Sequence, residues 1–379
     1  MEAARLLREE QPVATRTVVD KVRRSAEDWE VGVPEWLWNL SVADLPSLGG
    51  HIDDPTLPDI THDLRAGPEK ALPTHFDSRK RWPKCADVIG HVRNQGMCSS
   101  CWAQATAGTL DGRLCVATGG EFSGPRAWTS AGYVASCYSL DGHNGCSGGN
   151  AAWALQRAAT GGVPTGSTAK DTCVPYFSSG SFFDFLTGKT VKSPPCPASC
   201  TSSSYPRPLS ADKFYPSAQV QTSLLISDFK RTLMEGGPVP ISFDVYKDFL
   251  FYLGGHYDHS WGGEDVMYKH ATTAIGFERY KGKDYIISVN SWGKLWGSQG
   301  LFRMKADCCN VRFYLPGPLD PKKQAVPLPG PGPNCQSRTG GTCLLFGCDR
   351  SRGPATCSWP QCLCRPGYCA LGGVCVPKG

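Results

Sequence analysis

The sequence predicts an α+β fold with two lobes, a mainly helical lobe followed by a β-rich lobe. Apolar residues recur at helical spacing from Cys101 and stop before the glycine pair at 119 and 120. Alanines and a tryptophan over Asn150–Thr160 predict a second helix, which a further glycine pair ends. From Pro238 to Met304, apolar and polar residues alternate between glycine turns, a pattern typical of strands.

Residues 1–71 precede the predicted lobes. Four apolar residues recur there at helical spacing: Val18, Val22, Ala26 and Trp29. Prolines and charges dominate from Asp53 to Leu72, so the residues alone favour a small surface subdomain. Asn39 opens a sequon for N-glycosylation.

The first predicted helix begins with a cysteine, Cys101. At a helix N-terminus, unpaired backbone N–H groups and the helix dipole stabilise a thiolate, which lowers the pKa of the thiol. Gln95 lies six residues earlier and can donate its side-chain amide toward a developing oxyanion, together with the Cys101 N–H. The sequence therefore predicts a cysteine nucleophile with an oxyanion site beside it.

A partner for this thiol lies in the β-rich half. His270 opens the predicted strand Thr272–Phe277, and the next strand, Tyr285–Val289, is followed by Asn290 and Trp292. An asparagine can hold a histidine in one tautomer, and a tryptophan can keep water from their hydrogen bond. The pattern indicates a Cys-His-Asn arrangement.

With these residues in this order, the chain resembles the papain-like cysteine peptidases, and among them the cathepsin B group, from about Val18 to Leu315. Residues 98–102 match the family signature Cys-Gly-Ser/Ala-Cys-Trp/Tyr, with Ser99 in the place of glycine. Residues 145–149 match Gly-Cys-x-Gly-Gly, and Gln104 stands where the family has phenylalanine. Lys269 also replaces a glycine of the family.

The resemblance implies a papain-like cleft between the lobes in which Cys101 attacks the peptide carbonyl and His270 protonates the leaving amine. It also assigns six residues to substrate binding: Gly148, Gly149, Ser242, Ala271, Trp292 and Tyr314. Tyr314 would form the floor of the S2 pocket, or Phe313 if the alignment shifts by one residue. Because an aromatic floor offers no anion to a buried arginine, we expect apolar or aromatic P2 residues.

Cathepsin B binds substrate C-termini through two histidines on an inserted loop. The matching insertion here, between Cys173 and Cys196, has no histidine, and Lys189 and Lys192 are its only cations. We expect its three phenylalanines to pack the loop down or to contact apolar substrate: Phe182, Phe183 and Phe185. A lysine lacks the fixed geometry of an imidazole clamp, so we expect endopeptidase activity with little removal of dipeptides.

The resemblance and composition together divide the chain into four parts. Residues 1–71 would be an inhibitory propeptide, since cathepsin B zymogens share its order of helix, tryptophan and Leu-Gly-Gly. Residues 72–315 would be the peptidase, and 316–334 a proline-rich, extended linker. Residues 335–379 hold eight cysteines and resemble an EGF-like module that depends on disulfides. The tail has no histidine, which makes zinc the weaker alternative.

The resemblance also implies four disulfides in the peptidase part: Cys85–Cys115, Cys98–Cys146, Cys137–Cys196 and Cys173–Cys200. The adjacent Cys308 and Cys309 are either buried thiols or a local pair.

Composition limits the remaining alternatives. A net charge of +5 without a basic run argues against nucleic acid, and no apolar stretch approaches the roughly 18 residues of a membrane span. Nineteen cysteines indicate a lysosomal, vacuolar or secreted protein, although the first ten residues lack the apolar region of a signal peptide. We expect a monomer without cofactor or metal that acts on peptides or proteins, its tail binding an unknown ligand. The alternative is an inactive, peptidase-like protein that binds through the tail.

Overall fold

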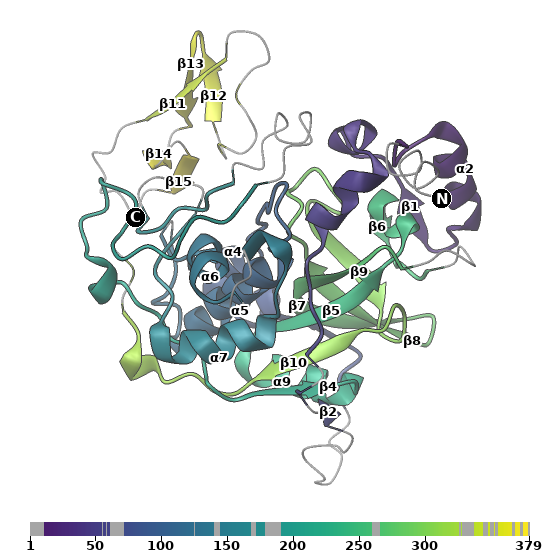
Figure 1. Ribbon diagram of the computed structural model, residues 1–379, viewed down its shortest axis with the longest axis horizontal. Helices are drawn as coiled ribbons and strands as arrows, with labels where there is room; N and C mark the ends of the chain where they lie inside the picture. The colour runs from purple at the N-terminus through teal and green to yellow at the C-terminus, as the bar shows by residue number, and fades with distance from the viewer. Residues whose placement is uncertain are drawn as a thin grey trace.

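The computed structural model describes residues 11–54, 56–57, 59–60, 72–124, 126–139, 145–167, 172–178, 191–259, 266–325, 327, 337–343, 348, 352, 355–365, 368–371 and 374–377. A helical lobe and a sheet lobe lie side by side, which confirms the predicted α+β class (Figure 1). The N-terminal segment lies against the sheet lobe, and the C-terminal module projects from the other end of the molecule.

The helical lobe is built around one long helix, α5 (Cys101–Ala117). Shorter α-helices surround it: α3 (Ser78–Arg81), α4 (Ala86–Ile89), α6 (Ala131–Cys137) and α7 (Ala151–Gly161). Three 3₁₀ turns complete the lobe: η3 (Pro83–Cys85), η4 (Gly145–Ser147) and η5 (Leu209–Ala211). Small residues let the sheet lobe approach α5, since a Cβ on Gly108 would lie 2.7 Å from Thr273 Oγ1. Both predicted helices are present, and the Asn150 side chain caps α7 by accepting from Ala152 N at 2.8 Å.

The sheet lobe contains an eight-stranded sheet, seven strands of which follow one another in this order: β2 (Asp59–Ile60), β4 (Val220–Ser223), β10 (Arg312–Pro316), β5 (Val239–Val245), β7 (Tyr268–Tyr280), β8 (Lys283–Val289) and β9 (Leu301–Lys305). The eighth strand, β3 (His75–Asp77), pairs with β7, and α9 (Ile226–Gly236) and η6 (Lys247–Phe251) flank the sheet. The two strands predicted around His270 and Asn290 lie within β7 and β8, which pair antiparallel. This pairing holds the two residues on neighbouring strands.

The N-terminal segment packs on the sheet lobe through α2 (Arg16–Ser25), β1 (Trp29–Val31), η1 (Glu35–Asn39) and η2 (Val42–Leu48). The helical spacing predicted a helix that extends to Trp29. This prediction was wrong at the C-terminal end, because α2 stops at Ser25. Trp29 instead begins β1, which pairs with the edge strand β6 (Tyr252–Gly255), and its ring lies 5.2 Å from that of Tyr257. Buried residues of this segment and of the sheet lobe form one continuous core, so the segment has no separate core among the described residues.

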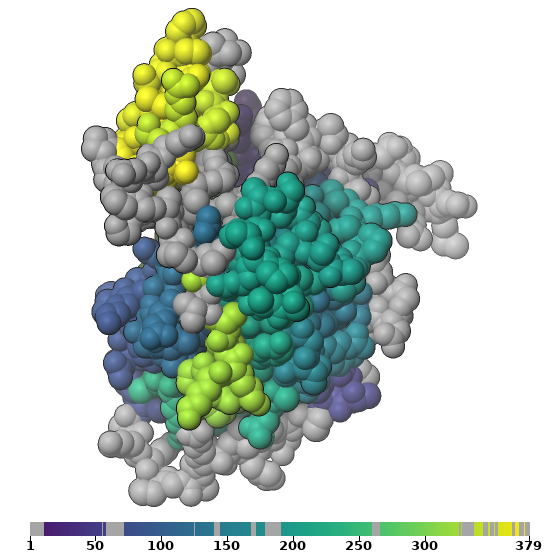
Figure 2. Space-filling model, turned by 90° about the vertical axis from the view of Figure 1, so that its left-hand side faces the viewer, coloured from purple at the N-terminus to yellow at the C-terminus, as the bar shows by residue number. Residues whose placement is uncertain are grey.

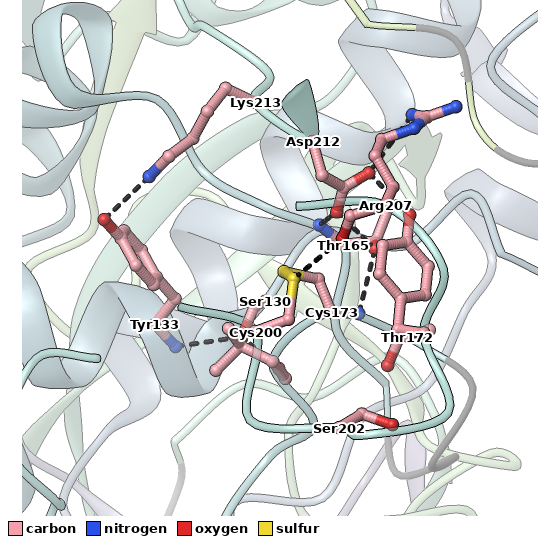
Figure 3. The surroundings of a disulfide bond; sticks show 12 residues. Ser130, Tyr133, Thr165, Thr172, Cys173, Cys200, Ser202, Arg207, Asp212 and Lys213 are labelled. Carbon is pink, nitrogen blue, oxygen red and sulfur yellow. Dashed lines mark hydrogen bonds and ion pairs between the residues drawn. A yellow bond between two sulfur atoms is a disulfide. The ribbon is translucent and has the colours of Figure 1, made fainter. Parts of the chain in front are cut away.

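Disulfides concentrate in the helical lobe. The structure contains the four pairs that the resemblance implies: Cys85–Cys115, Cys98–Cys146, Cys137–Cys196 and Cys173–Cys200. Figure 3 shows the last of these beside Asp212, which accepts hydrogen bonds from Thr165 N and Oγ1 at 2.8 and 2.6 Å. Of the two alternatives for Cys308 and Cys309, the structure has the local pair, a disulfide between neighbours.

The linker differs from the extended spacer predicted from residue 316 onward. Residues up to Ala325 pack on the helical lobe, and η7 (Pro321–Lys323) interrupts them. Arg113 is buried and donates to Pro316 O at 2.9 Å, and Tyr215 N donates to Gln324 Oε1 at 2.8 Å. Backbone carbonyls of the linker therefore accept hydrogen bonds from Nη2 of a buried guanidinium, which binds this part of the linker to the lobe.

The tail forms two small antiparallel sheets: β11 (Arg338–Thr342), β13 (Gln361–Cys364) and β12 (Ala355–Ser358) in one, β14 (Tyr368–Leu371) and β15 (Val374–Pro377) in the other. It projects at the top of Figure 2, away from the coloured surface of the two lobes. Three of its disulfides join residues that the structure describes: Cys343–Cys357, Cys348–Cys362 and Cys364–Cys375. Three sulfur atoms lie within 4.8 Å of one another because two of these bonds meet, so none of the three offers a free thiolate to a metal. Across the described residues, no helix is long and apolar enough to cross a membrane.

Candidate active site

The first residue of α5 meets the sheet lobe. Cys101 is buried and is the one free cysteine within the described ranges. Its Sγ accepts a hydrogen bond from Ala271 N at 3.4 Å, so the thiol lies against the residue that follows His270. Burial raises the pKa of Cys101 to about 12, although N–H groups of Ala271 and Trp102 oppose the rise. The predicted lowering of this pKa is therefore wrong for the chain as folded, because desolvation of the thiolate outweighs the helix N-terminus.

His270 and Asn290 form a hydrogen-bonded pair across β7 and β8. His270 Nε2 lies 2.8 Å from Asn290 Oδ1, which also accepts from Ser291 N at 2.7 Å. Because Oδ1 faces a backbone donor, it acts as the acceptor, and His270 carries its proton on Nε2. The Trp292 ring stacks on the imidazole at 4.8 Å between centroids, and both side chains are buried. Nδ1 is left without a hydrogen-bond partner, and burial lowers the pKa of His270 to about 4.

Gln95 is fixed between the lobes. Its backbone N–H donates to Ser291 O at 2.8 Å, and its side-chain Oε1 accepts from Ser291 Oγ at 2.7 Å. This leaves Nε2 to donate, and it contacts Cys98 O and Ser47 O at 3.0 Å each. The amide that was predicted to face an oxyanion thus points at a carbonyl of the N-terminal segment.

Residues 46–54 of that segment run along the cleft. Trp292 Nε1 donates to Leu48 O at 2.9 Å, and Gly149 N donates to Gly50 O at 2.9 Å. Gly50 has a φ of 119°, and a Cβ there would lie 2.1 Å from Ser99 O. Only glycine fits this approach, which explains the Leu-Gly-Gly order. Gly149 is equally constrained, since its Cβ would meet the Trp102 ring at 2.5 Å.

The residues expected to line a specificity pocket come together beside the cleft. The Tyr314 hydroxyl lies 3.0 Å from Ser242 Oγ, and Ala271 faces Ser242 across the pairing of β5 and β7. Phe313, the alternative floor residue, instead stacks on Phe229 at 4.8 Å in the sheet-lobe core. Tyr314 is therefore the aromatic residue at this pocket.

Two departures from the family sequence contact the N-terminal segment. Ser99 Oγ donates to Pro46 O at 2.9 Å. Lys269 Nζ lies 2.7 Å from Asp244 and 3.2 Å from Asp53. Both residues are thus partners of the segment that covers the cleft.

Sequence reasoning did not single out His51, whose ring occupies the Tyr314 pocket at 2.7 Å from the hydroxyl. No local signal marks this histidine, because its role depends on how the segment crosses the cleft. The Phe182, Phe183, Phe185 and Lys189 predictions lie outside the described residues, whereas Lys192 is exposed. The described ends of the insertion are fixed by its flanking disulfides, and Tyr176 OH donates to Gln95 O at 3.0 Å.

Residues 72–314 match the sequence model of the papain family of cysteine proteases. The chain belongs to this family. It is 35% identical to cathepsin B-like cysteine proteinase 6 of Caenorhabditis elegans over 65% of this chain and 66% of the relative. It is 34% identical to a cathepsin B-like cysteine proteinase of Schistosoma japonicum, over 64% of this chain and 70% of that protein.

A solved structure similar to most of the chain is a procathepsin B of Trypanosoma congolense. It shares 25% identity and a TM-score of 0.64, covering 81% of this chain and all of that one. A digestive procathepsin L of Tenebrio molitor, at 20% identity and a TM-score of 0.57, supports the fold alone. This papain-family chain is thus a cathepsin B-like cysteine peptidase with the fold of a zymogen.

Proposed function

We propose that the chain is the precursor of an endopeptidase that cleaves peptide bonds with Cys101, His270, Asn290 and Gln95. The observation that carries the proposal is the junction of α5 and β7, where the free thiol of Cys101 lies against Ala271, next to the His270–Asn290 pair. The helical lobe thereby supplies the nucleophile. The sheet lobe supplies the base and the amide that orients it, and thiol catalysis requires all three groups.

Each residue has one role in this mechanism. His270 Nδ1 takes the thiol proton, because Nε2–H is held by Asn290, and later donates it to the leaving amine. Cys101 Sγ attacks the carbonyl carbon, and water then hydrolyses the acyl-enzyme. Gln95 Nε2 and the Cys101 N–H stabilise the oxyanion once Ser47 has left the amide. Trp292 keeps water from the His270–Asn290 bond.

Residues 1–71 act as the inhibitory propeptide, and cleavage near Leu72 releases the enzyme. The support is that the segment occupies the cleft by hydrogen bonds to Trp292, Gln95 and Gly149. Added separately to processed enzyme, residues 1–71 are expected to inhibit at micromolar concentration. Absence of inhibition would reduce the segment to a structural element of the sheet lobe.

The processed chain is proposed to prefer apolar or aromatic P2 residues to arginine, since the pocket beside Gly149 ends at the aromatic Tyr314 and Ser242, which offer no anion to a buried guanidinium. It is also proposed to be an endopeptidase, because its insertion has no histidine clamp for a substrate carboxylate. Like other cathepsin B-like peptidases it would act in lysosomes or outside the cell.

Two measurements test this function. An epoxide inhibitor of thiol peptidases should label Cys101 of the processed protein, and Cys101→Ala should remove the label. Matched peptides, one with a free C-terminus and one amidated, should be cleaved internally at similar rates. If dipeptides leave the free acid much faster, and Lys189→Ala or Lys192→Ala abolishes that advantage, the lysines anchor the carboxylate and the endopeptidase assignment is wrong.

A further inference from the structure

A pocket beside the cleft encloses the imidazole of His51, whose side chain has no solvent exposure. Its backbone is fixed on both sides, since His51 N donates to Lys269 O at 3.1 Å and Ile52 N donates to Gly149 O at 2.8 Å. These contacts determine where the side chain enters. The imidazole therefore occupies the pocket as a bound side chain, and its contacts report what the pocket recognises.

The far end of the pocket carries two hydroxyl groups. Tyr314 OH lies 2.7 Å from His51 Nε2 and 3.0 Å from Ser242 Oγ. The Tyr314 ring is held in a buried cluster that includes Ala152 and Leu155, which fixes the position of its hydroxyl. Burial raises the pKa of Tyr314, so the hydroxyl keeps its proton and can donate to a ring nitrogen or accept from one.

Burial favours a neutral ring in this pocket, because it is the largest cause that lowers the pKa of His51. Asp53, on the same segment and 3.5 Å from Nε2, raises this pKa, and the positive charges of Lys269 and Arg312 lower it by less. An arginine or lysine side chain would bring a further positive charge toward Lys269 and Arg312 and would find hydroxyl groups at the end of the pocket. A phenylalanine ring has no hydrogen-bonding atom. With phenylalanine in the pocket, the Tyr314 hydroxyl would keep only its contact with Ser242 Oγ.

We propose that this pocket selects histidine at P2 of substrates through a hydrogen bond between the Tyr314 hydroxyl and the imidazole ring nitrogen. The inference rests on the proposed peptidase function and narrows its aromatic preference to a ring that carries a hydrogen-bonding atom. Tyr314 is then a specificity-determining residue that binds substrate without taking part in proton transfer.

The test uses the processed full-length protein and three reporter peptides that differ only at P2: histidine, thienylalanine and phenylalanine. Thienylalanine has a five-membered ring like that of histidine but no ring nitrogen. Measured as kcat/KM near neutral pH, the histidine reporter should exceed the thienylalanine reporter roughly 3- to 10-fold, the effect of one hydrogen bond. Tyr314→Phe should erase this ratio.

Ser242→Ala is the matched control, because it removes a hydroxyl of the same pair but leaves the one that contacts the ring. It should keep a histidine advantage; loss of the ratio to the extent seen for Tyr314→Phe would overturn the assignment to Tyr314. Equal cleavage of the histidine and thienylalanine reporters by the unmutated enzyme overturns the inference without any variant. If the phenylalanine reporter is cleaved in that case, the peptidase function stands. Cleavage of none of the three overturns the proposed function, and this inference with it.

Discussion

The two lobes reach stability by different means. In the helical lobe, four disulfides connect residues 27 to 59 positions apart, around a helix rich in alanine, glycine and threonine. In the described part of the sheet lobe, the disulfide is Cys308–Cys309, which joins neighbours and closes no loop. Large aromatic side chains fill this lobe instead, and the N-terminal segment contributes residues such as Trp29 and Trp36 to the same core.

In the function proposed above, this difference would place control of the enzyme in the sheet lobe. The proposed nucleophile and Gln95 belong to the covalently linked lobe, whereas His270 and Asn290 belong to the lobe that shares its core with the proposed propeptide. Cleavage of the proposed propeptide would expose the cleft without breaking a disulfide among the described residues. The catalytic halves can thus remain in place while access to them changes.

The largest expected effect is on the rate of peptide cleavage when the proposed catalytic groups of the helical lobe are removed one at a time. Cys101→Ala should abolish peptide cleavage by the processed enzyme, because no other thiol lies at the junction of α5 and β7 in the described chain. Gln95→Ala should lower kcat by ~10²–10³, the cost of one oxyanion donor. Steady-state kinetics with circular dichroism as a folding control measures both, and a Cys101→Ala protein that still turns over would contradict the assignment.

The second effect concerns the N-terminal segment, which runs along the cleft above Cys101. With the pKa of Cys101 raised to about 12 by burial, the thiol of the unprocessed chain is protonated near neutral pH and should react slowly with iodoacetamide, more rapidly as the pH approaches that value. Gly50→Ala should accelerate this labelling, because its Cβ would lie 2.1 Å from Ser99 O.

Gly254→Ala is the control for that substitution. It lies on β6, which pairs with the same N-terminal segment, but its Cβ would meet its nearest atom at an ordinary 3.7 Å. Equal labelling rates for Gly50→Ala, Gly254→Ala and the unmutated chain would show that the segment does not protect the thiol.

The third effect compares the disulfides of the two lobes. Replacing Cys85 and Cys115 by serine should lower the free energy of unfolding by about 2–4 kcal/mol, since the bond restricts a loop of the unfolded chain. Replacing Cys308 and Cys309 in the same way should cost less than about 1 kcal/mol, because a bond between neighbours restricts almost nothing. Denaturant titration followed by tryptophan fluorescence gives both values, and the reverse order would refute the comparison.

The smallest expected effect is on the tail. A chain ending at Ala325 should cleave small peptides as the whole chain does, because the tail supplies none of the proposed catalytic residues. A chain ending at Leu315 should be less stable by about 1–3 kcal/mol, since buried Arg113 loses its acceptors on residues 316 and 317. Thermal melting and kcat/KM distinguish the two, and loss of activity at Ala325 would give the tail a role in cleavage.

Much of the candidate site follows from residue type and order. A cysteine at a helix start, a glutamine shortly before it, and a histidine and asparagine on successive strands carry their chemistry in local patterns, and the structure brings them to the junction of the lobes. The helix from Cys101 and the strands around His270 were also predictable, because their apolar residues repeat with the period of the element they form.

Contacts between distant segments decided the rest. Trp29 continued the helical spacing, yet it pairs with β6, some 220 residues later, because a free strand edge outweighs a short run of helix propensity. The pKa of Cys101 rises because the folded chain, including a segment about 50 residues earlier, shuts the thiol from water, which no feature of its own helix reveals. The His51 side chain reaches the Tyr314 hydroxyl only because the residues on either side of it, Gly50 and Ile52, hydrogen-bond to Gly149. Local sequence thus specified the reacting groups and their elements, whereas their burial, ionisation and occupancy arise from surfaces that exist only after the chain has folded.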